Sequence, residues 1–172
     1  MAIFIKALIY TLKHEGGWVN DPLDTGGATN YGITLETAKR HGVLTEAALK
    51  GITQARIAEI YKADYWRFDG IEDQRVATKV FDMAVNMGRA TAIRYLQSIL
   101  NAAGAKLLMD GVYGSLTEAA VNRLSPQYLL TELCCVSEDH YRAIIERRPG
   151  AAKFAKGWLK RAKALPGEAS HA

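Results

Sequence analysis

Cysteine is nearly absent from this chain of 172 residues, and its two cysteines, Cys134 and Cys135, are adjacent. Adjacent cysteines suit neither an ordinary disulfide nor the usual spacing of zinc ligands. This excludes a disulfide-stapled secreted scaffold. We expect reduced thiols, as in a protein that folds in a cytoplasm.

Histidine is also scarce, and its placement argues against a metal site. His14 and Glu15 begin like the zinc-protease pattern H-E-x-x-H, but Trp18 occupies the position of the second histidine. The chain also lacks a phosphate-cradling glycine loop and a serine nucleophile elbow. We therefore expect no metal and no cofactor.

Long apolar runs are missing as well. The first apolar segment is interrupted by Lys6 and Lys13 and is far shorter than the roughly 20 residues that span a bilayer. No small-residue cleavage site follows an uninterrupted apolar core. We expect no membrane insertion and no secretory signal.

Strand signals are nearly absent outside residues 18–34, whereas apolar residues recur at helical spacing elsewhere. With 49% hydrophobic residues, the chain is long enough for one domain with a substantial core. The patterns predict a mainly α protein, with Thr53 as the N-cap of one helix. The expected helices cover about 3–12, 35–41, 53–66, 73–87, 90–103, 116–124, 127–147 and 151–164.

The formal charge is +4 and the sequence pI is about 9.1. A basic surface suits an anionic polymer, but no nucleic-acid recognition motif accompanies it, so we expect no nucleic-acid partner. The last predicted helix carries a run of basic residues, which we assign to its solvated face, with polymer contact as the alternative. These residues are Lys153, Lys156, Lys160, Arg161 and Lys163.

Residues 15–34 are dense in carboxylates, glycines and aromatic residues. A Gly-Gly pair directly after Glu15 can end the first helix because glycine tolerates positive φ. Glu15 should therefore lie in the last turn of that helix or just past it. Turn-forming residues on both sides of Asp24 then allow a loop or two-stranded ribbon to hold this carboxylate across a cleft from Glu15.

Two carboxylates across a cleft can break a glycosidic bond: one protonates the leaving oxygen and the other activates water or stabilises the sugar cation. The partial negative charge at a helix end favours the protonated Glu15 that a general acid needs. Thr29 is placed to hold Asp24 or the attacking water. Asp21 competes for the second role, although its place before Pro22 is typical of a turn. The plainer alternative is a solvated helix end and structural turn residues.

This segment resembles the signature E-G-G-W-x-N-D-P-x-D-x-G-G-x-T-x-x-G-I-T of glycoside hydrolase family 108 N-acetylmuramidases, found in phage endolysins and bacterial lysozyme-like proteins. It is also similar to the family 24 phage-type lysozymes, in which an Asp follows the Glu after eight residues and a Thr follows shortly after. The resemblance implies Glu15 as general acid, Asp24 as second carboxylate and Thr29 as the water-positioning residue. Trp18 and Tyr31 offer faces on which sugar rings stack.

Residues 80–88 resemble the F-D-x-x-V-N-x-G element of the same family, which lies on a helix that lines the cleft. Spacing alone places Asp82 and Asn86 together on the solvent face of a helix, because they are four residues apart. The resemblance implies instead that Asn86 binds an N-acetyl group or a sugar hydroxyl. Asp82 would support it or contact the substrate.

Residues 110–118 resemble the D-G-x-x-G-x-x-T element of the peptidoglycan-binding-type segment that accompanies this family. The same residues also have a structural interpretation. Ser115 and Glu118 have the spacing of a capping box, which predicts a Gly-rich turn that leads into a helix.

The resemblance implies a lysozyme-like helical fold in which a small β-ribbon or loop lobe forms one side of the active-site cleft. We expect a muramidase catalytic region at 1–95 and a C-terminal helical, peptidoglycan-binding-type region at 96–165 that completes a single compact fold. Residues 166–172 are expected to form a flexible tail.

The expected function is that of a lysozyme, which hydrolyses the β-1,4 bond between N-acetylmuramic acid and N-acetylglucosamine in peptidoglycan glycan strands. A lytic transglycosylase and a non-catalytic wall-binding protein remain as alternatives. We expect a monomeric phage or prophage endolysin made in the bacterial cytoplasm and released to the wall through a holin or another export route.

Overall fold

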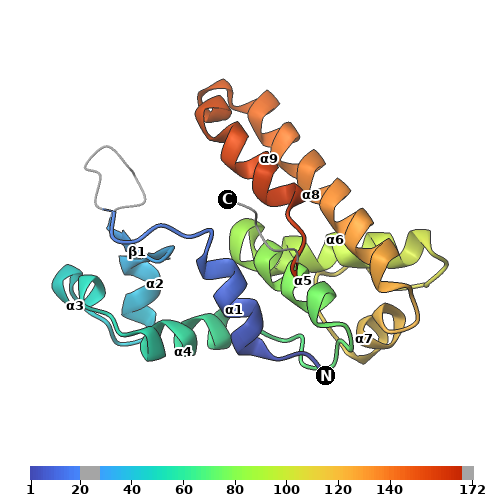
Figure 1. Ribbon diagram of the computed structural model, residues 1–172, viewed down its shortest axis with the longest axis horizontal. Helices are drawn as coiled ribbons and strands as arrows, with labels where there is room; N and C mark the ends of the chain where they lie inside the picture. The colour runs from blue at the N-terminus through green and yellow to red at the C-terminus, as the bar shows by residue number, and fades with distance from the viewer. Residues whose placement is uncertain (20–27, 168–172) are drawn as a thin grey trace.

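The computed structural model describes residues 1–19 and 28–167 (Figure 1). These residues form a mainly α structure with one small ribbon, so the fold class predicted from the sequence is confirmed. None of the helices they form is long and apolar enough to cross a membrane. The elements are α1 (Phe4–Leu12), β1 (Thr29–Asn30), β2 (Ile33–Thr34), α2 (Leu35–Arg40), α3 (Glu46–Lys50), α4 (Gln54–Tyr65), α5 (Gln74–Met87), α6 (Arg89–Ala102), α7 (Ser115–Val121), α8 (Pro126–Arg147), the 3-10 helix η1 (Pro149–Phe154) and α9 (Ala155–Lys163).

Helix α1 stands between two groups of elements (Figure 1). On one side lie the ribbon and the helices α2 to α4, which we call the ribbon lobe. On the other side lie α5 to α9, which we call the helical lobe. Because α1 contacts both α4 and α5, the chain just past the end of α1 lies where the two lobes meet.

Helix α5 is the centre of the helical lobe and packs against α1, α6 and α8. Every residue from Val76 to Ala84 is buried, so this helix has no solvated face along its middle. Asp73 caps its first turn by accepting hydrogen bonds from two backbone amides. Gly88 ends it with a φ of 88°, which glycine adopts without strain.

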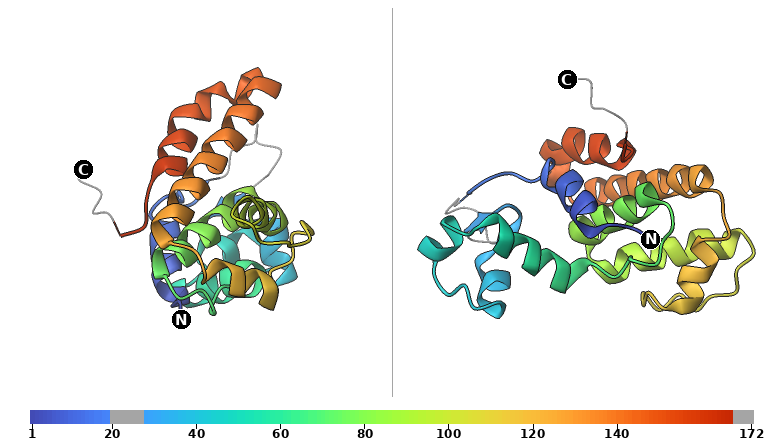
Figure 2. Two further views of the ribbon diagram at one scale, coloured as in Figure 1. Left: turned by 90° about the vertical axis from the view of Figure 1, so that its right-hand side faces the viewer. Right: turned by 60° about the horizontal axis from the view of Figure 1, so that its bottom comes forward.

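Helices α8 and α9 run side by side as a hairpin, with η1 between them (Figure 2). Trp158 stacks on Tyr141 of α8 at a centroid distance of 5.3 Å, and Ala162 is buried. One face of α9 therefore packs on α8, while most of its basic residues are exposed.

The ribbon is a hairpin with a two-residue turn, in which Asn30 pairs with Ile33. Tyr31 and Gly32 have φ values of 49° and 71°, the left-handed conformation that a tight hairpin turn requires. The buried side chain of Asn30 donates to the carbonyls of Leu49 and Lys50 at 2.9 and 3.1 Å. These bonds attach the ribbon to the end of α3.

Most predicted helices appear within a few residues of their expected bounds, and Thr53 caps α4 as predicted. Helix α3 was not predicted. The expected helix at 151–164 begins instead as the 3-10 turn η1. The capping box is wrong: Ser115 is the first residue of α7, Gly114 is its N-cap, and no side chain caps this end. Glycine has no side chain to cap with, and its extended backbone sets where the helix begins.

Candidate active site

Glu15 lies just past the end of α1, as the sequence predicted. Its backbone amide donates to the carbonyl of Leu12 at 3.3 Å, so the chain makes one further turn before it leaves the helix. The Glu15 side chain is 16% exposed. It is therefore held at the meeting of the two lobes and is not a solvated helix end.

A cation from the far end of the chain contacts this carboxylate. Nη2 of Arg161, on α9, lies 2.9 Å from Oε1 of Glu15, and the Arg161 side chain is only 12% exposed. The expectation from sequence did not include this cation. The guanidinium places a full positive charge against the Glu15 carboxylate.

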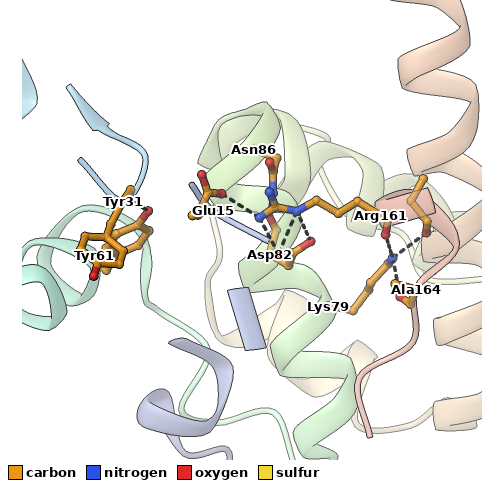
Figure 3. A network of polar contacts seen from close by, with 9 residues as sticks. Glu15, Tyr31, Tyr61, Lys79, Asp82, Asn86, Arg161 and Ala164 are labelled. Carbon is orange, nitrogen blue, oxygen red and sulfur yellow. Dashed lines mark hydrogen bonds and ion pairs between the residues drawn. The ribbon is translucent and has the colours of Figure 1, made fainter. Parts of the chain in front are cut away.

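Arg161 is shared with a second carboxylate, Asp82 of α5 (Figure 3). The Asp82 oxygens accept from Nε of Arg161 at 3.3 and 3.2 Å and from its Nη2 at 2.9 Å. Burial opposes the charge of Arg161, but Asp82 and then Glu15 outweigh burial and raise the pKa of this guanidinium. Arg161 is therefore a permanent cation between two carboxylates.

A buried lysine holds the same end of α9. Lys79, one turn before Asp82 on α5, is 1% exposed, and burial lowers its pKa. Its Nζ donates to the carbonyls of Ala162 and Ala164 at 2.6 and 3.0 Å (Figure 3). These carbonyls belong to the last turn of α9, where partial negative charge accumulates.

The ribbon contacts the other side of Glu15. A Cβ placed on Gly32 would lie 2.6 Å from Oε2 of Glu15 and 3.1 Å from the Tyr61 hydroxyl. That hydroxyl donates to the carbonyl of Tyr31 at 2.7 Å. The Glu15 carboxylate thus lies between the guanidinium of Arg161 and the bare backbone of the hairpin turn.

Three of the predicted site residues lie in or next to the ribbon. Thr29 is in β1 and exchanges backbone hydrogen bonds with Val19. Trp18 is partly buried against the core, and Lys50 Nζ lies 5.8 Å from the centre of its ring. Tyr31 is likewise partly buried at the hairpin turn. The contacts of Trp18 and Tyr31 with sugar, and the water-positioning role of Thr29, remain predictions.

The spacing of Asp82 and Asn86 alone suggested a shared solvent face, but the structure does not place them on one. Asp82 is 3% exposed because α5 is surrounded by other helices, whereas Asn86 is exposed and donates to the Asp82 carbonyl at 2.7 Å. Asp24 and its competitor Asp21 lie outside the described residues, so the second carboxylate and the wall it was expected to form stay predictions.

Arg161 and Lys79 were missed by the sequence analysis. Arg161 was grouped with the solvated basic face of the last helix, and this assignment is wrong for that residue. A signal was present: Arg161 follows Trp158 by three residues and precedes the apolar Ala162, which places it on the packed face of the helix. The neighbouring lysines led us to assign Arg161 to the same solvated face.

A hollow of about 330 Å³ lies elsewhere, between the start of α5 and the connection from α7 to α8. Ile71, Val76 and Leu129 are among its lining residues, and none of the predicted site residues is. We place the chemistry at Glu15 rather than in this hollow, because the charged side chains converge on Glu15.

Comparison with known proteins identifies the family of the chain. Residues 8–88 match the model of the family Glycosyl hydrolase 108, and residues 91–163 match that of the family described as "Predicted Peptidoglycan domain". No curated protein sequence matches. A solved structure of SagA from Brucella abortus is 32% identical, with a TM-score of 0.75 over 92% of this chain and 88% of that chain. The chain therefore belongs to the glycosyl hydrolase 108 family and is a lysozyme-like glycoside hydrolase that acts on peptidoglycan.

Proposed function

We propose that the protein is an N-acetylmuramidase that hydrolyses the β-1,4 bond between N-acetylmuramic acid and N-acetylglucosamine, with Glu15 as the general acid. The observation that carries the proposal is the placement of Glu15. The Glu15 carboxylate, 16% exposed, is held where the ribbon lobe meets the helical lobe. A glycan strand that passes between the lobes would bring its glycosidic oxygen to this carboxylate.

In this mechanism, Glu15 donates its proton to the leaving oxygen as the bond to the sugar breaks. Asp24, supported by Thr29, activates the water or stabilises the sugar cation. Asp82 does not fit this second role, because it is buried and bound to Arg161 through both oxygens. Trp18 and Tyr31 are proposed to contact the sugar rings, and Asn86 is proposed to bind an N-acetyl group or hydroxyl.

The test is digestion of purified peptidoglycan by the wild type and by Glu15→Gln, followed by mass spectrometry of the products. The amide keeps the size of the side chain but has no proton to donate, so we expect at least a hundredfold loss of activity with an unchanged melting temperature. Glu59→Gln is the matched control, because Glu59 is an exposed residue of α4 paired with Arg56. It should digest like the wild type.

The products separate the alternatives. Hydrolysis to a reducing N-acetylmuramic acid end supports the muramidase. Anhydro products would assign the chain to the lytic transglycosylases, which need one Glu and no second carboxylate. Pelleting with peptidoglycan without any digestion would indicate a non-catalytic wall-binding protein. Action as an endolysin that a holin releases to the wall is a further proposal, tested by whether the wild type lyses cells only when a holin is co-expressed.

A further inference from the structure

The buried charges around Glu15 are spread over three elements that are distant in the sequence. Glu15 follows α1, Asp82 is on α5 and Arg161 is on α9. Nη2 of Arg161 lies 2.9 Å from an oxygen of each carboxylate. A charge change at either Asp82 or Arg161 must therefore alter the field at Glu15.

We propose that Arg161 is a positioning residue for Glu15, and that Asp82 offsets its charge so that Glu15 can still carry a proton. On this proposal the C-terminal helix completes the active site and is not only a wall-binding surface. The proposal rests on the role of Glu15 given above. The experiment below can refute it without refuting that role.

The first support is how firmly the guanidinium is held. Asp82 binds it through two nitrogens, in the forked geometry that Arg forms with carboxylates. Lys79 fixes the end of α9 by its bonds to the carbonyls of Ala162 and Ala164. Both Lys79 and Asp82 belong to the buried middle of α5, so the core of the protein sets the position of Arg161.

The second support is the charge balance. A lone guanidinium beside Glu15 would keep it ionised, which is the wrong state for an acid that must donate a proton. Asp82 makes three contacts with the guanidinium and Glu15 makes one ion pair with it. Asp82 therefore sets a full negative charge against Arg161, while the position of the guanidinium still orients the Glu15 oxygen.

Other titratable groups of the described residues also face this cluster, and they stay unchanged in the test. The basic ones are His14 next to Glu15, whose pKa is lowered mainly by burial, and Lys79 on α5. The neutral ones are the tyrosines Tyr61 and Tyr65 of α4 and Tyr141 of α8. Differences between variants at Asp82 and Arg161 therefore report those two charges.

The experiment measures the pH dependence of peptidoglycan digestion for the wild type, Arg161→Gln, Arg161→Lys and Asp82→Asn. Activity should fall at high pH as the general acid loses its proton. Arg161→Gln removes the cation and leaves two carboxylates close together, so this alkaline limb should move up by about one pH unit. Asp82→Asn leaves the cation uncompensated, so the limb should move down by about one pH unit.

Arg161→Lys separates charge from geometry. Lysine keeps the positive charge but lacks the planar fork. Its alkaline limb should stay near that of the wild type, while kcat falls because the Glu15 oxygen is less well oriented. Arg142→Gln and Glu59→Gln are the matched controls. They remove the same charges from exposed positions on α8 and α4 and should leave the pH profile unchanged.

Opposite shifts for Arg161→Gln and Asp82→Asn support the proposal. If both variants melt at lower temperature but keep the wild-type profile, the cluster has only a structural role and the proposal is wrong, although an inactive Glu15→Gln would still support the muramidase. An active Glu15→Gln would instead overturn the role of Glu15. If Arg161→Gln does not fold, Asp82→Asn decides alone: a profile that does not move overturns the proposal.

Discussion

At the residue scale, the site depends on a position that has no side chain. Gly32 lets the hairpin turn approach the Glu15 carboxylate, because any Cβ there would lie 2.6 Å from Oε2. The same residue has a φ of 71°. The backbone conformation favours glycine at this position, and any side chain there would have to displace the Glu15 carboxylate.

We predict that Gly32→Ala lowers both stability and activity. The left-handed backbone costs a non-glycine residue roughly 1–2 kcal/mol, and the new methyl group must displace the Glu15 carboxylate from its contact with the turn. The free energy of unfolding in urea and the rate of peptidoglycan digestion measure the two effects.

Gly42→Ala is the control for this prediction. Gly42 has a φ of 81°, but an added Cβ would meet no atom within 4 Å. It should lose a similar amount of stability, again roughly 1–2 kcal/mol, without loss of digestion rate per folded molecule. Equal activity of the two variants would show that the contact between the turn and Glu15 has no effect on catalysis.

At the scale of elements, α5 is the helix on which the site is built. It is buried along its middle, and its two buried charged residues, Lys79 and Asp82, both bind α9. Its start is fixed by Asp73, whose Oδ1 accepts from the amides of Arg75 and Val76 at 2.9 and 3.2 Å. Loss of this cap would loosen the first turn of the central helix.

We predict that Asp73→Ala costs about 1 kcal/mol at neutral pH, and that this cost shrinks in acid. Burial alone would raise the pKa of Asp73, but hydrogen bonds from the Arg75 side chain and from the amides of Val76 and Arg75 lower it below the ordinary 3.8. The cap therefore stabilises the fold above pH 3.8 and loses its effect as the pH falls through the lower folded pKa.

Thr53→Ala provides the comparison, because the Thr53 hydroxyl caps α4 at 3.2 Å and does not titrate in acid. Its cost, also about 1 kcal/mol, should be independent of pH. Urea unfolding of both variants and the wild type from pH 7 down to pH 3 gives the two curves. Parallel curves for Asp73→Ala and Thr53→Ala would contradict the assigned charge effect.

At the scale of the whole molecule, the two segments matched by family models, 8–88 and 91–163, pack against each other. Helix α5, at the end of the first segment, packs against α6 and α8 of the second. The second segment also supplies Arg161 to Glu15. The proposed division into a catalytic region and a completing region thus describes the sequence, whereas the site draws on both.

We predict that a chain ended after residue 90 has no cooperative thermal transition and no activity. It lacks α6 to α9, so the packed surfaces of α5 face water, and Asp82 and Lys79 lose the partners that compensate their burial. Circular dichroism on heating and peptidoglycan digestion provide the measurements. A soluble, active fragment 1–90 would show that the second segment is an independent module.

The sequence by itself determined the mainly α fold and the helix that ends just before Glu15. It did so because helical periodicity, caps and glycines act within a few residues along the chain. The tertiary structure decided that Asp82 is buried, that Arg161 reaches Glu15 and that Lys79 holds the end of α9. These contacts join residues 79 to 146 positions apart. Local patterns carry no information on such pairs. One arginine of a basic run becomes buried and ion-paired only when helices that are distant in the sequence pack together.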